Sequence, residues 1–265
     1  MIEITGKTKL YCIVADPIHQ VKTPQNINKL FESRGIDGVL VPMHVAPAGL
    51  PAFMAAMRGV INLGGIVVTV PHKTAIAKLC DAVTPAAALV GAVNVIRREP
   101  DGRLVGDILD GKGFVSGLRA HGIEPQGKKA FLAGAGGAAN AIAFALAEAG
   151  VSQLTIHNRT TAKVEDLIAR LSTLYPAVRM TVGTRNPAGH DLVVNATSLG
   201  MAPGDPYPLD IQALTDDQIV AEIIMKPELT PLLAAAQHKG CRIQYGLPML
   251  QCQVELMATF MGVER

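Results

Sequence analysis

The chain has few of the residues that build disulfide frameworks, metal centres or nucleic-acid-binding surfaces. Its four cysteines are scattered without the spacing of a metal or redox motif, which predicts reduced thiols in a cytoplasmic protein. The seven histidines are equally dispersed, so we expect no metal site. Charged residues amount to 17%, the formal net charge is +2 and no long basic run occurs, so nucleic acid is not an expected partner.

The chain also lacks the pattern of a signal peptide or a membrane span. Residues 1–7 carry charges where a signal peptide has an apolar stretch. The most apolar window, residues 131–151, contains a glycine turn, Asn140 and Glu148, which favours a buried nucleotide-binding element over a membrane helix. We therefore expect no membrane association. No sustained heptad pattern occurs, so the sequence leaves open whether the protein is a monomer or a homodimer.

Hydrophobic residues make up 49% of the 265 positions, and this length suits two domains. In the first hundred residues, strand-like and helix-like segments alternate, which predicts an α/β domain. Strands are expected at 9–16, 38–45 and 65–70. Helices are expected at 24–34, with Thr23 as N-cap, at 50–57, and from the residues after Lys73 to about Cys80. A hairpin is expected from 92–98 and 103–109, followed by a connecting helix over 111–121.

From residue 128 the alternation of strands and helices is regular and predicts a Rossmann-type, doubly wound parallel sheet. Its strands are expected near 129–134, 153–158, 179–183, 191–196, 218–225 and 242–245. A last helix, 248–261, is expected to return to the first domain. The predicted division is residues 1–105 with 248–265 as the substrate-binding domain, and 106–247 as the cofactor-binding domain, with a substrate cleft between them.

A glycine turn joins the first strand of the predicted Rossmann domain to the helix that follows it. Its spacing, Gly134-x-Gly136-x-x-Ala139, gives a tight turn and brings backbone N–H groups close to a pyrophosphate. The N-terminus of the helix would hold this anion, because unpaired N–H groups and the helix dipole favour negative charge there. The predicted cofactor-binding residues of the turn are Gly134, Ala135, Gly136, Gly137, Ala138 and Ala139.

The end of the next strand indicates which dinucleotide binds. An NAD site usually has an acidic residue there, which holds the ribose 2′-hydroxyl. This chain has Asn158-Arg159-Thr160 instead, with Lys163 one helical turn later. Two cations and a hydroxyl suit a 2′-phosphate, so the predicted cofactor is NADP. A solvated helix start with ordinary surface charges is the alternative interpretation.

Two charged residues at predicted strand ends are candidates for proton transfer. Lys73 follows a strand and a proline, and Asp110 directly precedes Gly111. Oxidation of an alcohol by hydride transfer needs a group that accepts the hydroxyl proton, and a paired lysine and aspartate can do this. Spacing alone does not show that the two residues pair, and helix capping or a surface charge is the simpler interpretation of each.

The order of short motifs along nearly the whole chain resembles that of the shikimate dehydrogenase family. Any one of the motifs is common, whereas their joint order and spacing are specific. They are Pro17-Ile18…Thr23-Pro24, Val68-Thr69-Val70-Pro71-His72-Lys73, Gly91-Ala92-Val93-Asn94, Asp110-Gly111-x-Gly113-Phe114, the glycine turn, Asn158-Arg159-Thr160, Asn195-Ala196-Thr197…Gly200-Met201, Thr230-Pro231-Leu232-Leu233 and Gly246-Leu247-x-Met249-Leu250…Gln253.

The resemblance implies reversible NADP-linked oxidation of a cyclic hydroxy acid, shikimate or a close relative, to its keto form, as in aromatic amino acid biosynthesis. It implies that Lys73 and Asp110 form the catalytic pair. The implied substrate-binding residues are Thr23, Thr69, Asn94 and Gln253. The implied cofactor-binding residues, besides the glycine turn, are Asn158, Arg159, Thr160, Lys163, Thr197, Met201, Gly246 and Met249.

Several residues near the expected substrate differ from the family pattern. The family usually holds the substrate carboxylate with two hydroxyls in a Ser-x-Ser-Pro run, where this chain has Val21-Lys22-Thr23-Pro24. Lys22 would compensate for the missing hydroxyl if its ammonium reached the substrate carboxylate. In the alternative interpretation, Lys22 points to solvent. The remaining differences are Val67 for asparagine, Ile108-Leu109 for asparagine-threonine, Glu222 for aspartate and Met225 for tyrosine.

These differences predict a divergent, shikimate dehydrogenase-like paralogue with retained chemistry and altered recognition. Quinate, aminoshikimate or a less hydroxylated ring acid are the alternative substrates. Quinate is often oxidised with NAD, which Arg159 and Lys163 disfavour. A weakly catalytic NADPH-binding sensor is an alternative that the joint presence of Lys73 and Asp110 disfavours. A folate-dehydrogenase-like enzyme is another, which Gln253 and the run that begins at Gly246 disfavour.

Overall fold

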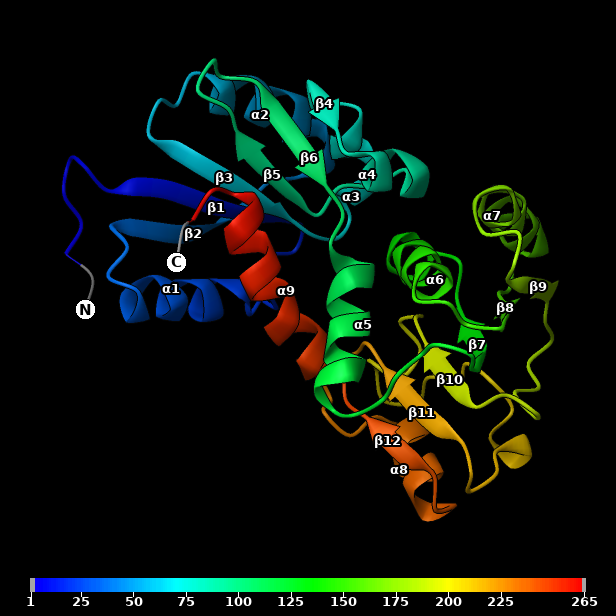
Figure 1. Ribbon diagram of the computed structural model, residues 1–265. Helices are drawn as coiled ribbons and strands as arrows, with labels where there is room; N and C mark the ends of the chain where they lie inside the picture. The colour runs from blue at the N-terminus through cyan, green and yellow to red at the C-terminus, as the bar shows by residue number, and fades with distance from the viewer. Residues whose placement is uncertain (1–2, 264–265) are drawn as a thin grey trace. The chain divides into compact units, whose positions relative to one another are not determined.

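The computed structural model of the protein describes residues 3–263, which form two compact units (Figure 1). Within these residues, the first unit comprises the chain up to Leu109 together with the segment from Gln253 onwards. The second unit is the continuous segment Asp110–Cys252. Both boundaries fall a few residues later than the sequence-based division, and the end of the chain groups with its beginning.

A six-stranded mixed sheet is the framework of the first unit. Three strands are parallel to one another, and a hairpin adds to them in antiparallel orientation. The sheet order is β2-β1-β3-β5-β6-β4, formed by β1 (Lys9–Ala15), β2 (Gly38–His44), β3 (Leu63–Val68), β4 (Ala82–Val83), β5 (Val95–Arg98) and β6 (Leu104–Asp107). The three parallel strands and the hairpin confirm the prediction from the sequence.

One apolar core joins the sheet of this unit to two helices. Tyr11 and Ile13 of β1 pack against Ile27 and Phe31 of α1 (Thr23–Ser33) and against the C-terminal part of α9 (Leu247–Phe260), where Met257 is buried. The opposite face carries α2 (Leu50–Arg58), which follows a single 3-10 turn, Pro47–Gly49 (Figure 1). The burial of apolar side chains on both faces explains why β1 and β3 consist of nearly continuous hydrophobic residues.

Some details of the first unit differ from the sequence-based expectation. The N-cap of α1 is Lys22, because Thr23 is already the first helical residue and is buried. The helix α3 (Lys73–Ala77) is shorter than expected. β4 and α4 (Pro85–Val90) were not predicted, since two residues give no periodic signal and α4 has no polar side chain. Thr84 at the N-cap of α4 was a usable signal.

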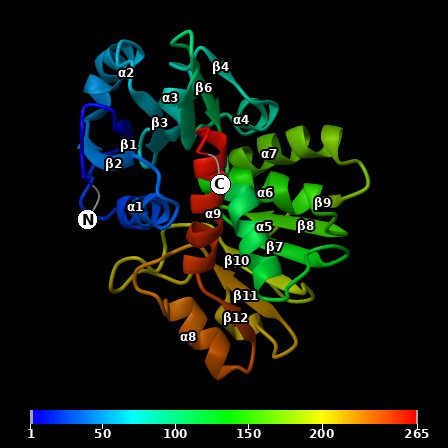
Figure 2. The same cartoon turned by 60° about the vertical axis from the view of Figure 1, so that its left-hand side comes forward.

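The second unit contains a six-stranded sheet in which all strands are parallel. Its order is β12-β11-β10-β7-β8-β9, formed by β7 (Lys129–Ala133), β8 (Gln153–His157), β9 (Arg179–Val182), β10 (Leu192–Asn195), β11 (Ile219–Glu222) and β12 (Arg242–Gln244). Figure 2 shows α6 (Gly137–Glu148) and α7 (Thr161–Leu174) on one face and α8 (Pro231–His238) on the other. This is the doubly wound sheet that the sequence predicts. A 3-10 turn, Ile211–Ala213, precedes β11.

The strand order of this sheet reverses at β7. The chain proceeds from β7 to β8 and β9 on one side, and then returns to place β10 on the other side. In parallel sheets the carboxyl ends of the strands share one edge, and ligands bind outside that edge where the order reverses. The chain that follows Ala133, His157 and Asn195 is therefore the expected position of a binding site.

Helix α5 (Asp110–Ala120) packs closely against α6 at Gly111. A Cβ atom on Gly111 would collide with the carbonyl oxygen of Ala141 and would lie 2.7 Å from the Cβ of Ala145. Only glycine allows this approach, so Gly111 fixes the position of the preceding Asp110 relative to α6. Among the helices within residues 3–263, none is long and apolar enough to cross a membrane.

Candidate functional site

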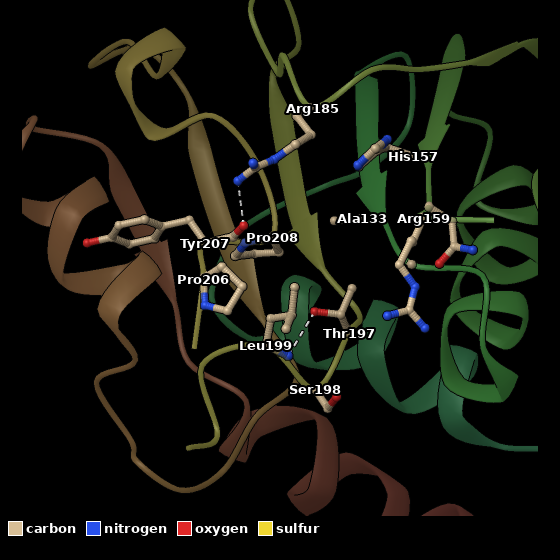
Figure 3. Close-up of a pocket in the computed structure, with 12 residues that line it drawn as sticks. Ala133, His157, Arg159, Arg185, Thr197, Ser198, Leu199, Pro206, Tyr207 and Pro208 are labelled. Atoms are coloured by element: carbon tan, nitrogen blue, oxygen red, sulfur yellow. Dashed lines mark hydrogen bonds between the residues drawn. The ribbon is translucent and has the colours of Figure 1, made fainter. Parts of the chain in front are cut away.

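A pocket of about 490 Å³ lies at the reversal point of the parallel sheet (Figure 3). Residues that end or follow three neighbouring strands form it, together with a loop rich in proline. It is lined by Ala133 and Gly134 after β7, His157, Asn158 and Arg159 after β8, Thr197, Ser198 and Leu199 after β10, and Arg185, Pro206, Tyr207 and Pro208. The pocket thus occupies the edge that the strand order predicts.

The glycine turn forms the part of this site nearest to α6. Gly134 has a φ of +120°, and a Cβ atom there would lie 2.8 Å from the carbonyl oxygen of Ala196. At Gly136 and Gly137 a Cβ atom would meet nothing within 4 Å, so the backbone borders open space. The N-cap of α6 is Gly136, whose lack of a side chain leaves room at the helix N-terminus. This is the geometry in which backbone N–H groups hold an anion.

The side chain of Asn140 holds the glycine turn in place. Its amide nitrogen donates to the carbonyl oxygens of Ala135, at 3.1 Å, and Gly136, at 2.9 Å. Its oxygen in turn accepts a hydrogen bond of 2.7 Å from Arg170 of α7. In the sequence, Asn140 stands out only as a polar residue in an apolar window. Its isolated position in a buried helix was the signal that it has a structural role.

Arg159 is the predicted cation that lines the pocket. It follows β8 and is exposed, while the amide nitrogen of Asn158 donates to the backbone oxygen of Thr160 and shapes the start of α7. Thr160 is the N-cap of α7, and its side chain makes no capping bond. Lys163 is exposed in the first turn of the same helix, and it is not one of the residues that line the pocket.

A second arginine lines the pocket and was missed from the sequence. Arg185 lies in the loop after β9, and its Nη2 donates to the backbone oxygen of Tyr207 at 2.7 Å (Figure 3). The backbone N–H of Asp210 donates to the oxygen of Arg185, which ties the two loops together. No motif marks Arg185, because its place in the pocket depends on the path of two loops that are distant in sequence.

The turn after β10 is organised by buried polar side chains. The oxygen of Asn195 accepts from both the backbone N–H and the hydroxyl of Thr197, at 3.0 and 2.7 Å. The Thr197 oxygen accepts from the backbone N–H of Leu199 at 3.0 Å (Figure 3). The amide nitrogen of Asn195 donates to Glu222 of β11 at 2.9 Å. Thr197, a predicted cofactor-binding residue, is therefore held by contacts with the interior of the unit.

The other predicted cofactor residues follow β10, follow β12 or lie at the start of α9. Met201 follows the turn after β10 and is 56% exposed. Gly246 is buried after β12, and a Cβ atom there would collide with the carbonyl oxygen of Ile224. Met249, in the first turn of α9, is half-buried, and its N–H donates to the Gly246 oxygen at 3.2 Å.

In the first unit, backbone hydrogen bonds bring three predicted site residues to one edge of the mixed sheet. Thr69 directly follows β3, and the N–H of the preceding Val68 donates to the oxygen of Asn94 at 2.8 Å. The N–H of Val93 donates to the oxygen of Lys73 at 2.9 Å. Thr69, Lys73 and Asn94 are thus neighbours, although they are separated in the sequence.

Asn94 also helps to position the chain that leads to Asp110. Its side-chain oxygen accepts a hydrogen bond of 2.8 Å from the backbone N–H of Leu109, which ends the first of the two segments of the first unit. Asn94 is almost completely buried, as are Asp110, the first residue of α5, and Gln253 of α9. Buried polar side chains in such number are costly unless they serve structure or ligand binding.

The residues that differ from the expected carboxylate-binding run lie at the start of α1. Val21 packs against the apolar core of the first unit, and Lys22 is exposed. Thr23 is buried. Val67 and Leu109, two further differences, belong to the same apolar core. These three aliphatic side chains therefore belong to, or pack against, one apolar core, and the three differences are not isolated from one another.

Among residues 3–263, no group of three or more histidine, cysteine, aspartate or glutamate side chains is arranged to hold a metal ion. The cysteines within this part of the chain are all free thiols. Burial raises the pKa of Cys12 to about 12 and that of Cys80 to about 11. Neither thiol is therefore an effective nucleophile at neutral pH.

Two sequence models match the chain. The model of the shikimate dehydrogenase substrate-binding domain matches residues 13–96, and that of shikimate/quinate 5-dehydrogenase matches residues 119–201. Among curated proteins, the shikimate dehydrogenase (NADP(+)) of Rubrobacter xylanophilus is 38% identical over 265 aligned residues, which cover 98% of this chain and 90% of that protein.

Solved structures agree over nearly the full length. Shikimate 5-dehydrogenase of Listeria monocytogenes, solved with shikimate and NAD, has a TM-score of 0.91 and 32% identity, and the match covers 100% of this chain and 95% of that one. The 5-ketofructose reductase of Gluconobacter sp. strain CHM43 has a TM-score of 0.87 and 30% identity, with 97% and 94% of the two chains covered.

The buried carboxyl group of Glu222 predicts a pH-dependent stability. Burial raises its pKa from 4.5 to about 7, against the opposing effect of its hydrogen bonds. Because the pKa in the folded state is raised, the protonated carboxyl stabilises the fold below pH 4.5, and this contribution is lost as the pH rises through 7. The shift corresponds to about 3 kcal/mol.

Urea unfolding of the wild type and of Glu222→Gln at pH 5 and pH 8 measures this effect. The stability of the wild type relative to the variant should fall by about 2–3 kcal/mol between the two pH values, since glutamine does not titrate. A difference that stays constant with pH would contradict the raised pKa.

Proposed function

The chain belongs to the shikimate dehydrogenase family, and from this premise we propose that it oxidises shikimate reversibly to its 3-keto form with NADP. It is an oxidoreductase, and its cofactor is NADP. The observation that carries the proposed reaction is the edge of the first unit at which Thr69, Lys73 and Asn94 meet. A protein that only bound a dinucleotide would have no need of this cluster outside its Rossmann unit.

The pocket of the second unit suits the adenosine end of NADP. Arg159 and Arg185 line it, and none of the described residues lining it carries a carboxylate. A 2′-phosphate needs positive charge and hydrogen-bond donors, whereas a free ribose is usually held by an acidic residue. The backbone at Gly136 and Gly137 borders open space on the Cβ side, and its N–H groups would hold the pyrophosphate.

Lys73 and Asp110 are the proposed catalytic pair. Bound NADP would supply the hydride acceptor for the ring carbon that carries the reacting hydroxyl. The hydroxyl also loses its proton, and Lys73 with Asp110 would accept it and return it in the reverse direction. Gly111 supports this role of Asp110, because its contact with Ala141 fixes the start of α5.

Thr23, Thr69, Asn94 and Gln253 are the proposed contacts to the ring hydroxyls and the carboxylate. Loss of one hydrogen bond to a charged group, as Val21 implies, costs about 1.5–3 kcal/mol, or about one to two decades in affinity. This loss favours a related ring acid as a second candidate substrate. Lys22, which directly follows Val21, is exposed and would compensate for the loss if it reached the carboxylate. The packing of Val21, Val67 and Leu109 in one core accounts for these changes without a new substrate and favours shikimate.

A substrate panel tests the proposed reaction. Purified protein with NADP would receive shikimate, quinate or aminoshikimate in separate assays that follow NADPH absorbance. We expect saturable turnover of shikimate and much slower turnover when NAD replaces NADP. Turnover of quinate or aminoshikimate alone would favour the divergent paralogue. Binding of NADPH without turnover of any of the three would favour the sensor and contradict the proposal.

Substitution of the proposed catalytic lysine should slow the chemical step. Lys73→Ala is expected to lower kcat for shikimate by about 10²–10⁴-fold, because a positioned acid–base group contributes about this factor. The NADPH dissociation constant should stay within about twofold of wild type. Lys78→Ala, at the exposed C-cap of the same helix, is the matched control and should keep full activity. An unchanged kcat in Lys73→Ala would refute the assigned role.

Arg159 should determine the preference for the phosphorylated cofactor. Arg159→Asp is expected to raise the dissociation constant of NADPH by about 10–100-fold, because it removes a cation from the 2′-phosphate and adds repulsion. NADH affinity should change far less, since NADH lacks this group. Arg179→Asp, with the same charge change at the amino end of β9, should affect neither cofactor. Equal losses for NADPH and NADH in Arg159→Asp would place the arginine away from the phosphate.

A further inference from the structure

A completely buried carboxylate lies directly behind the cofactor pocket, and the proposed chemistry does not use it. Glu222 ends β11 and accepts hydrogen bonds on both oxygens. Its Oε1 accepts from the backbone N–H groups of Ile223, at 2.8 Å, and Ile224, at 3.1 Å. Its Oε2 accepts from the amide nitrogen of Asn195 at 2.9 Å and from the hydroxyl of Thr230 at 3.2 Å.

We propose that Glu222 is a positioning residue that fixes the turn Thr197–Gly200 and, through this turn, the affinity for the cofactor. The proposal rests on the proposed use of the pocket at the sheet edge. Glu222 has no exposed surface, so it cannot touch a ligand itself. Its hydrogen bond to Asn195 connects it to residues that line the pocket.

The direction of the hydrogen bonds carries the argument. At pH 8.5, above its pKa of about 7, the Glu222 carboxyl is ionised and only accepts, so it requires the –NH₂ group of Asn195 to face it. The same nitrogen also donates to the backbone oxygen of Leu199 at 3.1 Å. The Asn195 oxygen must then face Thr197, whose N–H and hydroxyl both donate to it. The charge on Glu222 therefore stabilises the same orientation of the Asn195 amide that the backbone groups of Leu199 and Thr197 favour.

The consequence for the pocket follows from the same chain of bonds. Because the Thr197 hydroxyl donates to Asn195, its oxygen is oriented to accept from the N–H of Leu199. Thr197, Ser198 and Leu199 form one wall of the pocket (Figure 3). Reversal of the Asn195 amide would leave the donors of Thr197 facing an –NH₂ group and would release this wall.

Glu222→Gln tests the inference while it keeps the size of the side chain. With its oxygen towards Ile223 and Ile224, the new amide places an –NH₂ group against that of Asn195. We expect the dissociation constant of NADPH to rise at least about tenfold at pH 8.5, while the KM for shikimate changes less than about threefold. An unchanged NADPH affinity in the folded variant would overturn the inference.

A second variant restores the polarity of the network. In Glu222→Gln/Asn195→Asp, the glutamine –NH₂ donates to the new carboxylate, which also accepts from the N–H and hydroxyl of Thr197. The Leu199 oxygen still loses its donor, so recovery is expected to be partial. The double variant should bind NADPH more tightly than either single variant. If the double variant does not bind NADPH more tightly than each single variant, the proposed orientation of the Asn195 amide is wrong.

Amide hydrogen exchange gives a readout that needs no cofactor. Glu222→Gln should speed exchange at Thr197 and Leu199 at least about tenfold, and the double variant should reverse part of this change. Exchange at Ile223 and Ile224 should change little, because the glutamine oxygen still accepts from them. If the wild type does not bind NADPH, the proposed function fails, while these exchange rates still decide the role of Glu222. Equal acceleration at all four amides would indicate general loosening and overturn the inference.

Discussion

Parallel pairing of β7 with both β8 and β10 is the constraint on which the rest of the site depends. It places the carboxyl ends of three strands at one edge of the sheet. The connections after β7 and β10 run to opposite sides of the reversal point, which leaves a crevice between them. The glycine turn, Arg159 and Thr197 stand at this edge because each directly follows one of these strands. Asn140 stabilises the glycine turn through the backbone oxygens of Ala135 and Gly136, and Glu222 stabilises the turn after β10 through Asn195.

The sequence predicts those features whose signal is local. Hydrophobic strands separated by helices predict the doubly wound sheet, and the spacing of Gly134 and Gly136 predicts the turn before α6. Arg185 could not be found in this way, because its contact with Tyr207 joins two loops whose paths have no sequence pattern. The roles assigned to Lys73 and Asp110 come from the resemblance to a family, since no periodicity or spacing indicates that two charges act together.

The residues that depart from the family pattern show how a substitution can be interpreted in two ways. Considered alone, Val21 and Val67 indicate a less polar binding site. In the structure both pack against the same apolar core as Leu109, where an aliphatic side chain gains from burial in the ordinary way. Glu222 is the opposite case, because a longer acidic side chain remains in a fully buried position and every oxygen finds donors. Packing explains the first group, and hydrogen bonding explains the second.

The arrangement of the units along the chain has a consequence for the order of folding during synthesis. The second unit is one continuous segment, Asp110–Cys252, so all its strands are synthesised before the residues from Gln253 onwards, which belong to the first unit. The core of the first unit includes Val254, Met257 and Met261, which are synthesised after the whole of the second unit. The core of the first unit therefore stays incomplete until the second unit has been synthesised, although most of the first unit is made before it.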